Sequence, residues 1–222
     1  GNEDEIIDEE TASNIIKYYD LVHSNQTQPL FDHSLSYLTA SLSLTSNTTQ
    51  RSRAMRALSS ILSTSPPELA TQLLARNDLQ LAMKSALLDA STSVREATID
   101  LIGKFMLTSK QTILLDKYIG LICDRILDNG VSVRKRVIKI IREVCAQYND
   151  YAKIDELCFA VLKRINDDEE GIRKLVIETF TNMWFKGNID IKTKVNSLLS
   201  VVGHVVLKQN VDLLTTLFDY IF

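Results

Sequence analysis

Apolar residues recur along much of the chain with the spacing of one buried helix face. The clearest run starts at Ile172, and apolar residues or a threonine follow three, four, seven, eight and eleven positions later. Runs that start at Val94 and Val133 follow the same template, except that Arg136 occupies an apolar position of the second run. Such periodicity is typical of half-buried amphipathic helices, whereas strands alternate every second residue. The sequence therefore predicts an all-α protein.

A polar turn precedes each of these three helices, and the turns recur at a fixed interval. Each turn begins with an aspartate, and an aliphatic residue and an arginine follow it at five and six positions. The three pairs are Asp89 and Arg95, Asp128 and Arg134, and Asp167 and Arg173. Successive aspartates are 39 residues apart. Repetition at this interval is typical of stacked helical hairpins, each of which buries its apolar face against the next.

In each turn the aspartate and the arginine can form an ion pair with each other or with the next copy. A planar guanidinium suits both a carboxylate and the carbonyls of a packed turn, so a structural ladder is favoured over a binding site. Ser93 and Ser132 are candidate helix N-caps, because a side-chain oxygen there can accept from the first free amides. Arg56 lies 39 residues before Arg95, which indicates a degenerate fourth copy.

Further helices are expected on both sides of these turns. Pro66 and Pro67 end one helix and start another, which continues to about Leu88 unless it breaks near Asn77. The other expected helices span residues 11–22, 29–44, 50–63, 110–127, 153–166, 189–208 and 211–222. We expect residues 1–10 to form an acidic, flexible lead-in and residues 11–222 to form the solenoid. Because the last helix is too apolar for a terminal cap, we expect further repeats beyond it or a partner.

Three stretches carry a resemblance more specific than the repeat itself. They are residues 89–105 (DASTSVREATIDLIGKF), 125–144 (RILDNGVSVRKRVIKIIREV) and 161–185 (VLKRINDDEEGIRKLVIETFTNMWF). The paired helices resemble HEAT repeats, which favours an α-solenoid of about five hairpins in a right-handed superhelical stack. Together, over about residues 68–208, the stretches resemble the Nipped-B family of cohesin loaders. The sequence departs from that family after Phe185, where Gly187 and Asn188 replace a longer, proline-containing link, and this leaves the orientation of the last hairpin open.

The resemblance also implies a function. A protein of this family is expected in the nucleus, associated with chromatin, where it holds duplex DNA against the ATPase heads and kleisin of the cohesin ring. It is expected to stimulate ATP hydrolysis by cohesin without hydrolysing ATP itself. A loader partner subunit is expected to bind elsewhere on the full-length chain.

No constellation for catalysis or metal binding is present in the sequence. His23, His33 and His204 fall in different repeats, and no cysteine or carboxylate accompanies them at metal-ligand spacing. The seven glycines are scattered and form no phosphate-binding loop. We therefore expect no catalytic residues, no cofactor, no metal and no small-molecule substrate.

The cysteines and the apolar segments bear on the compartment. Cys123, Cys145 and Cys158 show no CxxC spacing and have apolar neighbours, which is typical of reduced thiols in the core of an intracellular protein. No secretory signal is visible, and the most apolar stretch, residues 198–207, is too short to cross a bilayer.

The most informative surface signal is basic, although the net charge of −3 does not by itself point to nucleic acid. Between positions 133 and 143 the sequence has five cations and a single acid, Glu143. Helical geometry places three of the cations next to one another, opposite the buried stripe. Stacked repeats would align such residues as a stripe that binds phosphate through counterion release. The candidate DNA-binding residues are Lys135, Lys139 and Arg142, followed by Arg136, Lys104 and Lys174.

Two other interpretations remain open at this stage. Like charges on a helix face are often only a solvated surface, and the sequence alone does not separate that case from DNA binding. The near-neutral charge also permits a HEAT scaffold or adaptor that binds protein alone. Binding to duplex DNA across a salt series distinguishes these interpretations.

Overall fold

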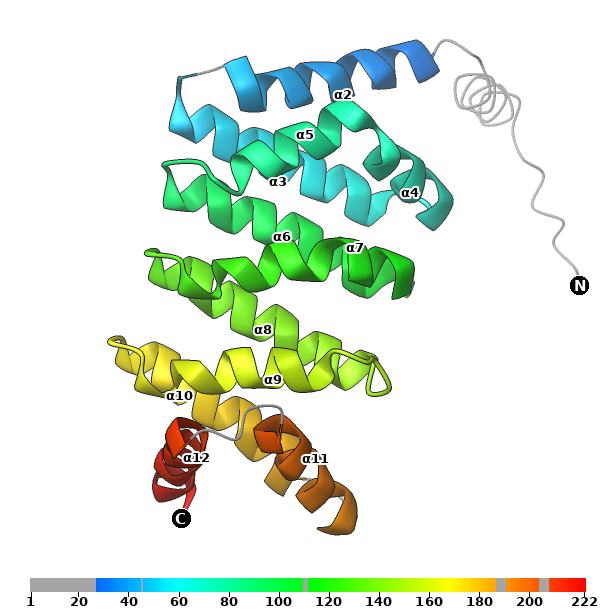
Figure 1. The fold of residues 1–222 in the computed structure, drawn as a ribbon. Coiled ribbons are helices and arrows are strands. Elements are labelled where there is room, and N and C mark those ends of the chain that lie inside the picture. The colour runs from blue at the N-terminus through cyan, green and yellow to red at the C-terminus, as the bar shows by residue number, and fades with distance from the viewer. Residues whose placement is uncertain (1–26, 45, 110–111, 187–190, 204–207) are drawn as a thin grey trace, which may run out of the picture.

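A computed structural model describes residues 27–44, 46–109, 112–186, 191–203 and 208–222. All regular elements in these ranges are helical (Figure 1). The expected helix at residues 11–22 and the acidic lead-in lie outside the described residues. No described helix is both long enough and apolar enough to cross a membrane.

Two layers of helices stack into one elongated rod (Figure 1). The first layer contains α2 (Thr27–Leu44), α4 (Pro67–Ala75), α5 (Asn77–Ala86), α7 (Thr112–Cys123), α9 (Ile154–Leu162) and α11 (Ile191–Gly203). The second layer contains α3 (Thr48–Thr64), α6 (Thr92–Ser109), α8 (Val131–Gln147) and α10 (Glu170–Phe180). The last helix, α12 (Lys208–Ile221), packs against α10 at the end of the rod. The all-α solenoid of stacked hairpins that the sequence predicts is therefore confirmed.

The helix boundaries differ from the expectation in two ways. The first-layer helices α7 and α9 tighten into 3-10 turns before each aspartate, at η1 (Asp124–Leu127) and η2 (Lys163–Asn166). The second-layer helices α6 and α8 begin one residue before Ser93 and Ser132, so these two serines lie inside the first helical turn. The residue at the N-cap of α8 is Gly130, which offers no side-chain acceptor. The prediction that both serines are N-caps was wrong.

The core lies between the two layers and is built from the predicted apolar stripes. Val94, Val133 and Ile172, which open the three runs, are fully buried. Adjacent second-layer helices also approach each other closely. A β-carbon on Gly103 of α6 would lie 2.3 Å from Ile140 Cδ1 of α8, so only glycine permits this spacing without displacing Ile140.

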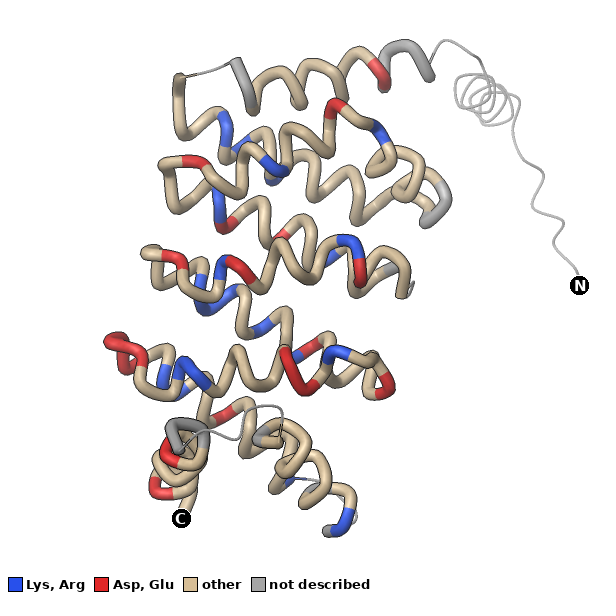
Figure 2. The backbone as a smooth tube through the Cα atoms, viewed as in Figure 1, with Lys and Arg blue, Asp and Glu red and all other residues tan. Residues whose placement is uncertain are grey.

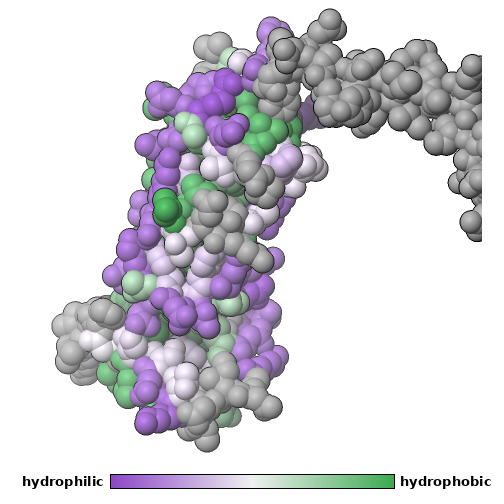
Figure 3. Space-filling model, turned by 90° about the vertical axis from the view of Figure 1, so that its right-hand side faces the viewer, coloured by the Kyte–Doolittle hydropathy of each residue, from purple (hydrophilic) through white to green (hydrophobic). Residues whose placement is uncertain are grey.

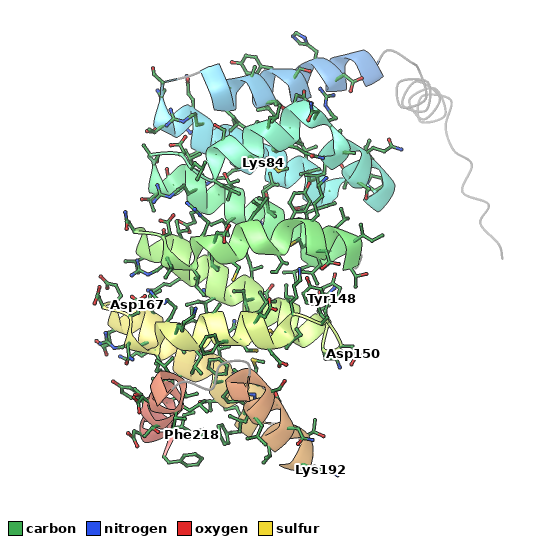
Figure 4. All side chains as sticks on the ribbon, in the orientation of Figure 1. Lys84, Tyr148, Asp150, Asp167, Lys192 and Phe218 are labelled. Carbon is green, nitrogen blue, oxygen red and sulfur yellow. The ribbon has the colours of Figure 1, made fainter. Side chains whose placement is uncertain are left out.

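The outer turns lead from a second-layer helix to the next first-layer helix, and the one between α8 and α9 joins neighbouring repeats through two tyrosines. Figure 4 shows Tyr148 and Asp150 at this edge of the rod, opposite the edge that carries Asp167. The Tyr148 hydroxyl donates to the Met106 carbonyl at 3.0 Å, and the Tyr151 hydroxyl donates to Asp116 Oδ1 at 2.6 Å. Figure 3 views this side, where apolar residues show in separate patches among hydrophilic ones.

The last hairpin is arranged differently from the others. After α10 the backbone widens into a short π-helical segment, η3 (Thr181–Phe185), where Trp184 lies against Phe180 with ring centroids 4.4 Å apart. The ring of Phe185 then contacts Phe222 of the C-terminal segment at 5.4 Å and Phe218 of α12 at 6.3 Å. Aromatic packing therefore positions this end of the rod.

Candidate nucleic-acid interface

The inner turns, which lead from a first-layer helix to the following second-layer helix, form one edge of the rod. Figure 2 shows charges of both signs gathered along this edge. Arg95 donates from Nη2 to Asp128 Oδ1 at 2.7 Å and from Nε to Asp128 Oδ2 at 2.8 Å. Arg134 makes a single bond of this kind, from Nη2 to Asp167 Oδ1 at 2.9 Å. Arg95 and Arg134 therefore each pair with the aspartate of the next copy, and among the described residues no ion pair joins the aspartate and the arginine of one copy.

Each arginine also closes its own turn through backbone carbonyls. Arg95 Nη1 donates to the Asp89 carbonyl at 2.7 Å, and Arg134 Nη1 donates to the Asp128 carbonyl at 2.7 Å. Arg173 makes the same contact with the Asp167 carbonyl at 2.6 Å. Arg95 and Arg134 therefore contact both the carbonyl of their own turn and the aspartate of the next copy, which holds two successive turns at a fixed separation.

The aspartates order the backbone of their own turns as well. Asp128 Oδ1 accepts from the Gly130 amide at 2.7 Å, and Asp89 Oδ1 accepts from the Ser91 amide at 2.8 Å. Burial by itself would raise the pKa of Asp128, but the hydrogen bonds from Arg95 and Gly130 outweigh it and lower that pKa. The hydrogen bond from Arg51 is the main cause that lowers the pKa of Asp89. Both carboxylates are therefore held in the charged form.

The series of ion pairs extends one repeat towards the N-terminus, through Arg51, which does not lie at the 39-residue interval. Arg51 Nε donates to Asp89 Oδ2 at 2.7 Å, whereas the expected Arg56 is exposed. Arg51, Arg95 and Arg134 are each the fourth residue of their helix. The interval from Arg51 to Arg95 is 44 residues, because the first-layer element between them is broken at Arg76 into α4 and α5. The prediction that Arg56 marks the fourth copy was wrong for this reason.

The six candidate DNA-binding residues lie on three second-layer helices, but acidic neighbours hold four of them. Lys104 and Arg136 both pair with Asp100, at 2.9 and 3.2 Å. The other two pairs are Arg142 with Glu178 at 3.3 Å and Lys174 with Glu170 at 2.5 Å. Among the described residues, no ion pair involves Lys135 or Lys139.

Counting from the ladder arginines shows how these charges align across helices. Lys135 and Lys174 each follow a ladder-type arginine directly, so they occupy equivalent positions on α8 and α10. A β-carbon on Gly171 would lie 2.8 Å from Lys135 Nζ, which places this ammonium against the first turn of α10. Five residues after each arginine the charge alternates instead. This alternating row consists of Arg56, Asp100, Lys139 and Glu178. The expected continuous basic stripe is therefore concentrated on α8 and the start of α10.

A groove on the second layer runs beside this basic region. Its volume is about 470 Å³, and residues of α3, α6 and α8 line it. Arg56, Lys104 and Arg136 face Glu96 and Asp100 across a floor that includes hydroxyl side chains of α3. Because charges of both signs meet here, the groove by itself does not select an anion.

Two charged residues that the sequence analysis did not single out contribute to this edge. Arg164 Nη1 lies 3.6 Å from Asp167 Oδ2, and Arg125 donates to the Leu87 carbonyl at 3.5 Å. Both arginines stand three residues before a ladder aspartate, a spacing that was visible in the sequence. Asp100 also carried a signal, because it lies four residues before Lys104 on one helix face.

No group of three or more potential metal ligands comes together in the part of the chain that the structure describes. The three cysteines are free thiols. His204, one of the three scattered histidines, lies outside the described residues.

Comparison with known proteins places this geometry in a family. A family model described as sister chromatid cohesion protein PDS5 protein matches residues 6–221. The Nipped-B protein of Drosophila melanogaster is 45% identical over 77 residues, which are 35% of this chain and 3% of that protein. The Nipped-B-like protein of Homo sapiens is 40% identical over 77 residues, 35% of this chain and 2% of that protein. The matched segment is thus a small fraction of these curated relatives.

Solved structures with the same architecture include a cohesin loader. The C-terminal fragment of Chaetomium thermophilum cohesin loader SCC2 superposes with a TM-score of 0.64 at 22% identity, over 80% of this chain and 13% of that chain. A designed armadillo repeat protein in complex with peptide (KR)4 superposes with a TM-score of 0.51 at 17% identity, over 97% of this chain and 95% of that chain. At these identities the likeness shows the fold, a solenoid of helical repeats. Together with the Nipped-B relatives, these findings confirm the resemblance predicted from the three stretches of sequence.

Proposed function

The chain belongs to the sister chromatid cohesion protein PDS5 family, and on this premise we propose that it is a HEAT-repeat scaffold segment that binds DNA and cohesin subunits and promotes cohesin loading. It would act in the nucleus, on chromatin, and would stimulate the cohesin ATPase without hydrolysing ATP itself. Its partners would be the ATPase heads and kleisin of the cohesin ring, duplex DNA and, elsewhere on a longer chain, a loader partner subunit.

The observation that carries the DNA proposal is the pair Lys135 and Lys139 on α8. They lie one turn apart on a helix held in place by the ladder, and among the described residues neither has a carboxylate partner. Two further cations flank them. Lys174 and Arg142 pair with carboxylates that are more than half exposed. An exposed ion pair of this kind contributes only about 0–1 kcal/mol to stability, so a DNA phosphate can replace the carboxylate as the partner of the cation.

Lys104 and Arg136 have a smaller part in the proposal. Asp100, whose side chain is only 21% exposed, pairs with both. Because one half-buried carboxylate offsets two cations, these two residues add less to the potential that attracts a phosphate backbone. We propose that they border the DNA contact and that Lys135 and Lys139 form its centre.

Binding of the chain to a DNA duplex at several salt concentrations tests this assignment. Wild-type affinity should fall steeply between about 50 and 200 mM salt, since cations that contact phosphates release counterions. Changing both Lys135 and Lys139 to Glu should weaken binding and reduce the slope of log affinity against log salt by about 2. Lys84→Glu combined with Lys117→Glu makes the same change of charge on exposed first-layer positions (Figure 4 labels Lys84) and should leave the slope unchanged. Equal effects of the two double variants would reject Lys135 and Lys139 as the site.

A second candidate function, a scaffold that binds only protein, is favoured by the alternating row. In this row, cations alternate with acids at Arg56, Asp100, Lys139 and Glu178. Such a row matches a partner protein whose charges alternate in the opposite sense better than it matches a uniformly negative phosphate backbone. Capture of purified cohesin ATPase heads and kleisin by the chain, in the absence of DNA, measures this function. Retention of both partners by the Lys135→Glu, Lys139→Glu variant, with no measurable DNA binding by wild type, would favour the protein-only scaffold.

A further inference from the structure

Two buried cysteines face each other across the α8–α9 hairpin. Cys145 Sγ of α8 lies 3.8 Å from Cys158 Sγ of α9, and the two residues are 8% and 3% exposed. Both belong to one repeat, and a loop of only six residues joins their helices. Neither thiol takes part in the ladder or in the basic region. The pair is therefore a feature that the proposed scaffold function does not use.

A groove gives solvent access to one of the two thiols. It has a volume of about 670 Å³ and lies between the end of α8, the start of α9, η3 and α11. Cys145 lines this groove together with Ala146 and Trp184, whereas Cys158 does not line it. A small polar oxidant that enters the groove thus meets Cys145 first, with Cys158 directly behind it.

The third cysteine has a different setting and provides an internal comparison. Cys123 is more exposed than the pair and lies at the end of α7. No sulfur contact to Cys123 occurs in the part of the chain that the structure describes. If exposure alone controlled oxidation, Cys123 would react first. If proximity of a second thiol controls disulfide formation, Cys145 and Cys158 would pair instead.

We propose that Cys145 and Cys158 form an oxidation site that consumes one hydrogen peroxide and closes a disulfide between α8 and α9. The Cys145 sulfur attacks one peroxide oxygen and the O–O bond breaks, and the thiol proton joins the departing hydroxide, so that a sulfenic acid and one water result. The Cys158 sulfur then attacks the Cys145 sulfur and the S–O bond breaks, and the Cys158 proton joins the departing hydroxide, so that a second water leaves as the S–S bond forms. Two thiols are oxidised, and both oxygens of the peroxide are reduced to water.

The order of the two steps follows from the surroundings of each thiol. The hydrogen bond with Cys145 and burial both raise the pKa of Cys158, so this thiol stays protonated and inert towards an external oxidant. The contact of 3.8 Å must shorten to about 2.05 Å, the length of a disulfide. A rotation at Cys145, which borders the open groove, can supply much of this movement without displacing the core around Cys158.

The test is oxidation of the folded chain by hydrogen peroxide, with removal of the peroxide by catalase, unfolding, and alkylation of the remaining thiols with N-ethylmaleimide. Intact mass should show a species with one alkylated cysteine instead of three, and non-reducing peptide mapping should join Cys145 to Cys158. The Cys145–Cys158 link should form at least about tenfold faster than any link to Cys123, because the partner sulfur is already in contact.

Variants separate this site from general thiol oxidation. Cys123→Ser should leave the rate of crosslinking unchanged, and Cys158→Ser should abolish the crosslink while Cys145 still gives a sulfenic acid that dimedone traps. Circular dichroism checks that each variant is folded, and if one is not, peptide mapping of the wild-type chain decides alone. Three alkylated cysteines after peroxide treatment, a disulfide to Cys123 of equal yield, or irreversible oxidation of Cys145 beside an intact Cys158 thiol would each overturn the proposal.

Discussion

The central repeats and the last hairpin are built from similar helices but are held together by different means. Between α6 and α10, the arginine of one inner turn forms an ion pair with the aspartate of the next. The two carboxylates and two guanidinium groups of these pairs are largely buried. After α10 the series stops. Arg173 donates to the Asp167 and Asp168 carbonyls, but the structure gives it no carboxylate partner among the described residues. The sequence has Val206 where the next aspartate would be expected.

The packing of the two regions differs accordingly. The second-layer helices of the central repeats bury complete apolar stripes, such as Val133, Val137, Ile140, Ile141 and Val144 on α8. Among the described side chains of α11 and α12, by contrast, only Val201 and Leu217 are buried, and Val195, Leu199, Val211 and Tyr220 are exposed. An ion-pair ladder thus accompanies regular stacking, and its loss accompanies an end where aromatic rings join α12 to η3. Four measurements test this comparison.

The largest effect is expected at the ladder. Asp128→Ala removes the carboxylate that pairs with Arg95, whose side chain is 11% exposed, and leaves a guanidinium without its charge partner. The free energy of unfolding, measured by urea titration, should fall by about 3–5 kcal/mol. Asp168→Ala, at an exposed position of the neighbouring turn, is the matched control and should change it by less than about 0.5 kcal/mol. A cost near 1 kcal/mol for Asp128→Ala would mean that this aspartate only caps its turn.

Shortening an apolar side chain should also cost far more stability in the central repeats than in the last hairpin. Ile140 of α8 is 4% exposed and fills the space beside Gly103, so Ile140→Ala should lower the free energy of unfolding by about 2–5 kcal/mol. Leu199 of α11 is 63% exposed, so Leu199→Ala should cost less than about 1 kcal/mol. Similar costs at the two sites, measured under identical conditions, would show that the last hairpin is packed as tightly as the centre.

A smaller difference is expected between two arginines at equivalent positions. Arg95→Ala leaves the buried Asp128 without its hydrogen-bonded guanidinium, whereas Arg173→Ala removes hydrogen bonds to two carbonyls and breaks no ion pair. The first variant should therefore be less stable than the second by about 2 kcal/mol in urea titration. Because both changes delete the same side chain, the difference isolates the pairing across repeats. Equal stabilities would mean that the buried Asp128 contributes nothing through its charge.

The smallest expected effect is a change in the dependence of stability on acid. Contacts with Arg51 and Arg95 help to lower the pKa values of Asp89 and Asp128 in the folded chain. The stabilisation of the folded chain by these two ionised aspartates is therefore complete above the ordinary pKa of 3.8. It is lost as the pH falls through their lower pKa values in the folded chain. The urea midpoint should decline more steeply below about pH 4 in wild type than in Asp128→Asn. Asp212→Asn, in the last hairpin, should keep the wild-type profile, and a profile like that of Asp128→Asn would contradict this account.

At the candidate site, patterns in the sequence did not predict every charged contact. The 39-residue interval predicted Arg56 as the fourth ladder residue, but the break between α4 and α5 shifts the register, and Arg51 takes that place. Helical geometry correctly grouped Lys135 and Lys139 on one face of α8. It did not predict Asp100, which lies on α6 and binds Arg136 of α8. A pattern within one helix does not contain the charges that a neighbouring helix contributes.

The sequence alone determined that the chain is helical, that its hairpins stack, and which family it resembles, because the period of the apolar stripe and the repeat of the inner turn are local properties of the chain. Only the tertiary structure decided that Arg95 pairs with Asp128 and not with Asp89, that Asp100 offsets two cations, and that Cys145 meets Cys158. Such contacts depend on the separation and rotation of adjacent helices. Ångström-scale packing of side chains such as Ile140 against Gly103 sets that separation, and no interval in the sequence encodes it.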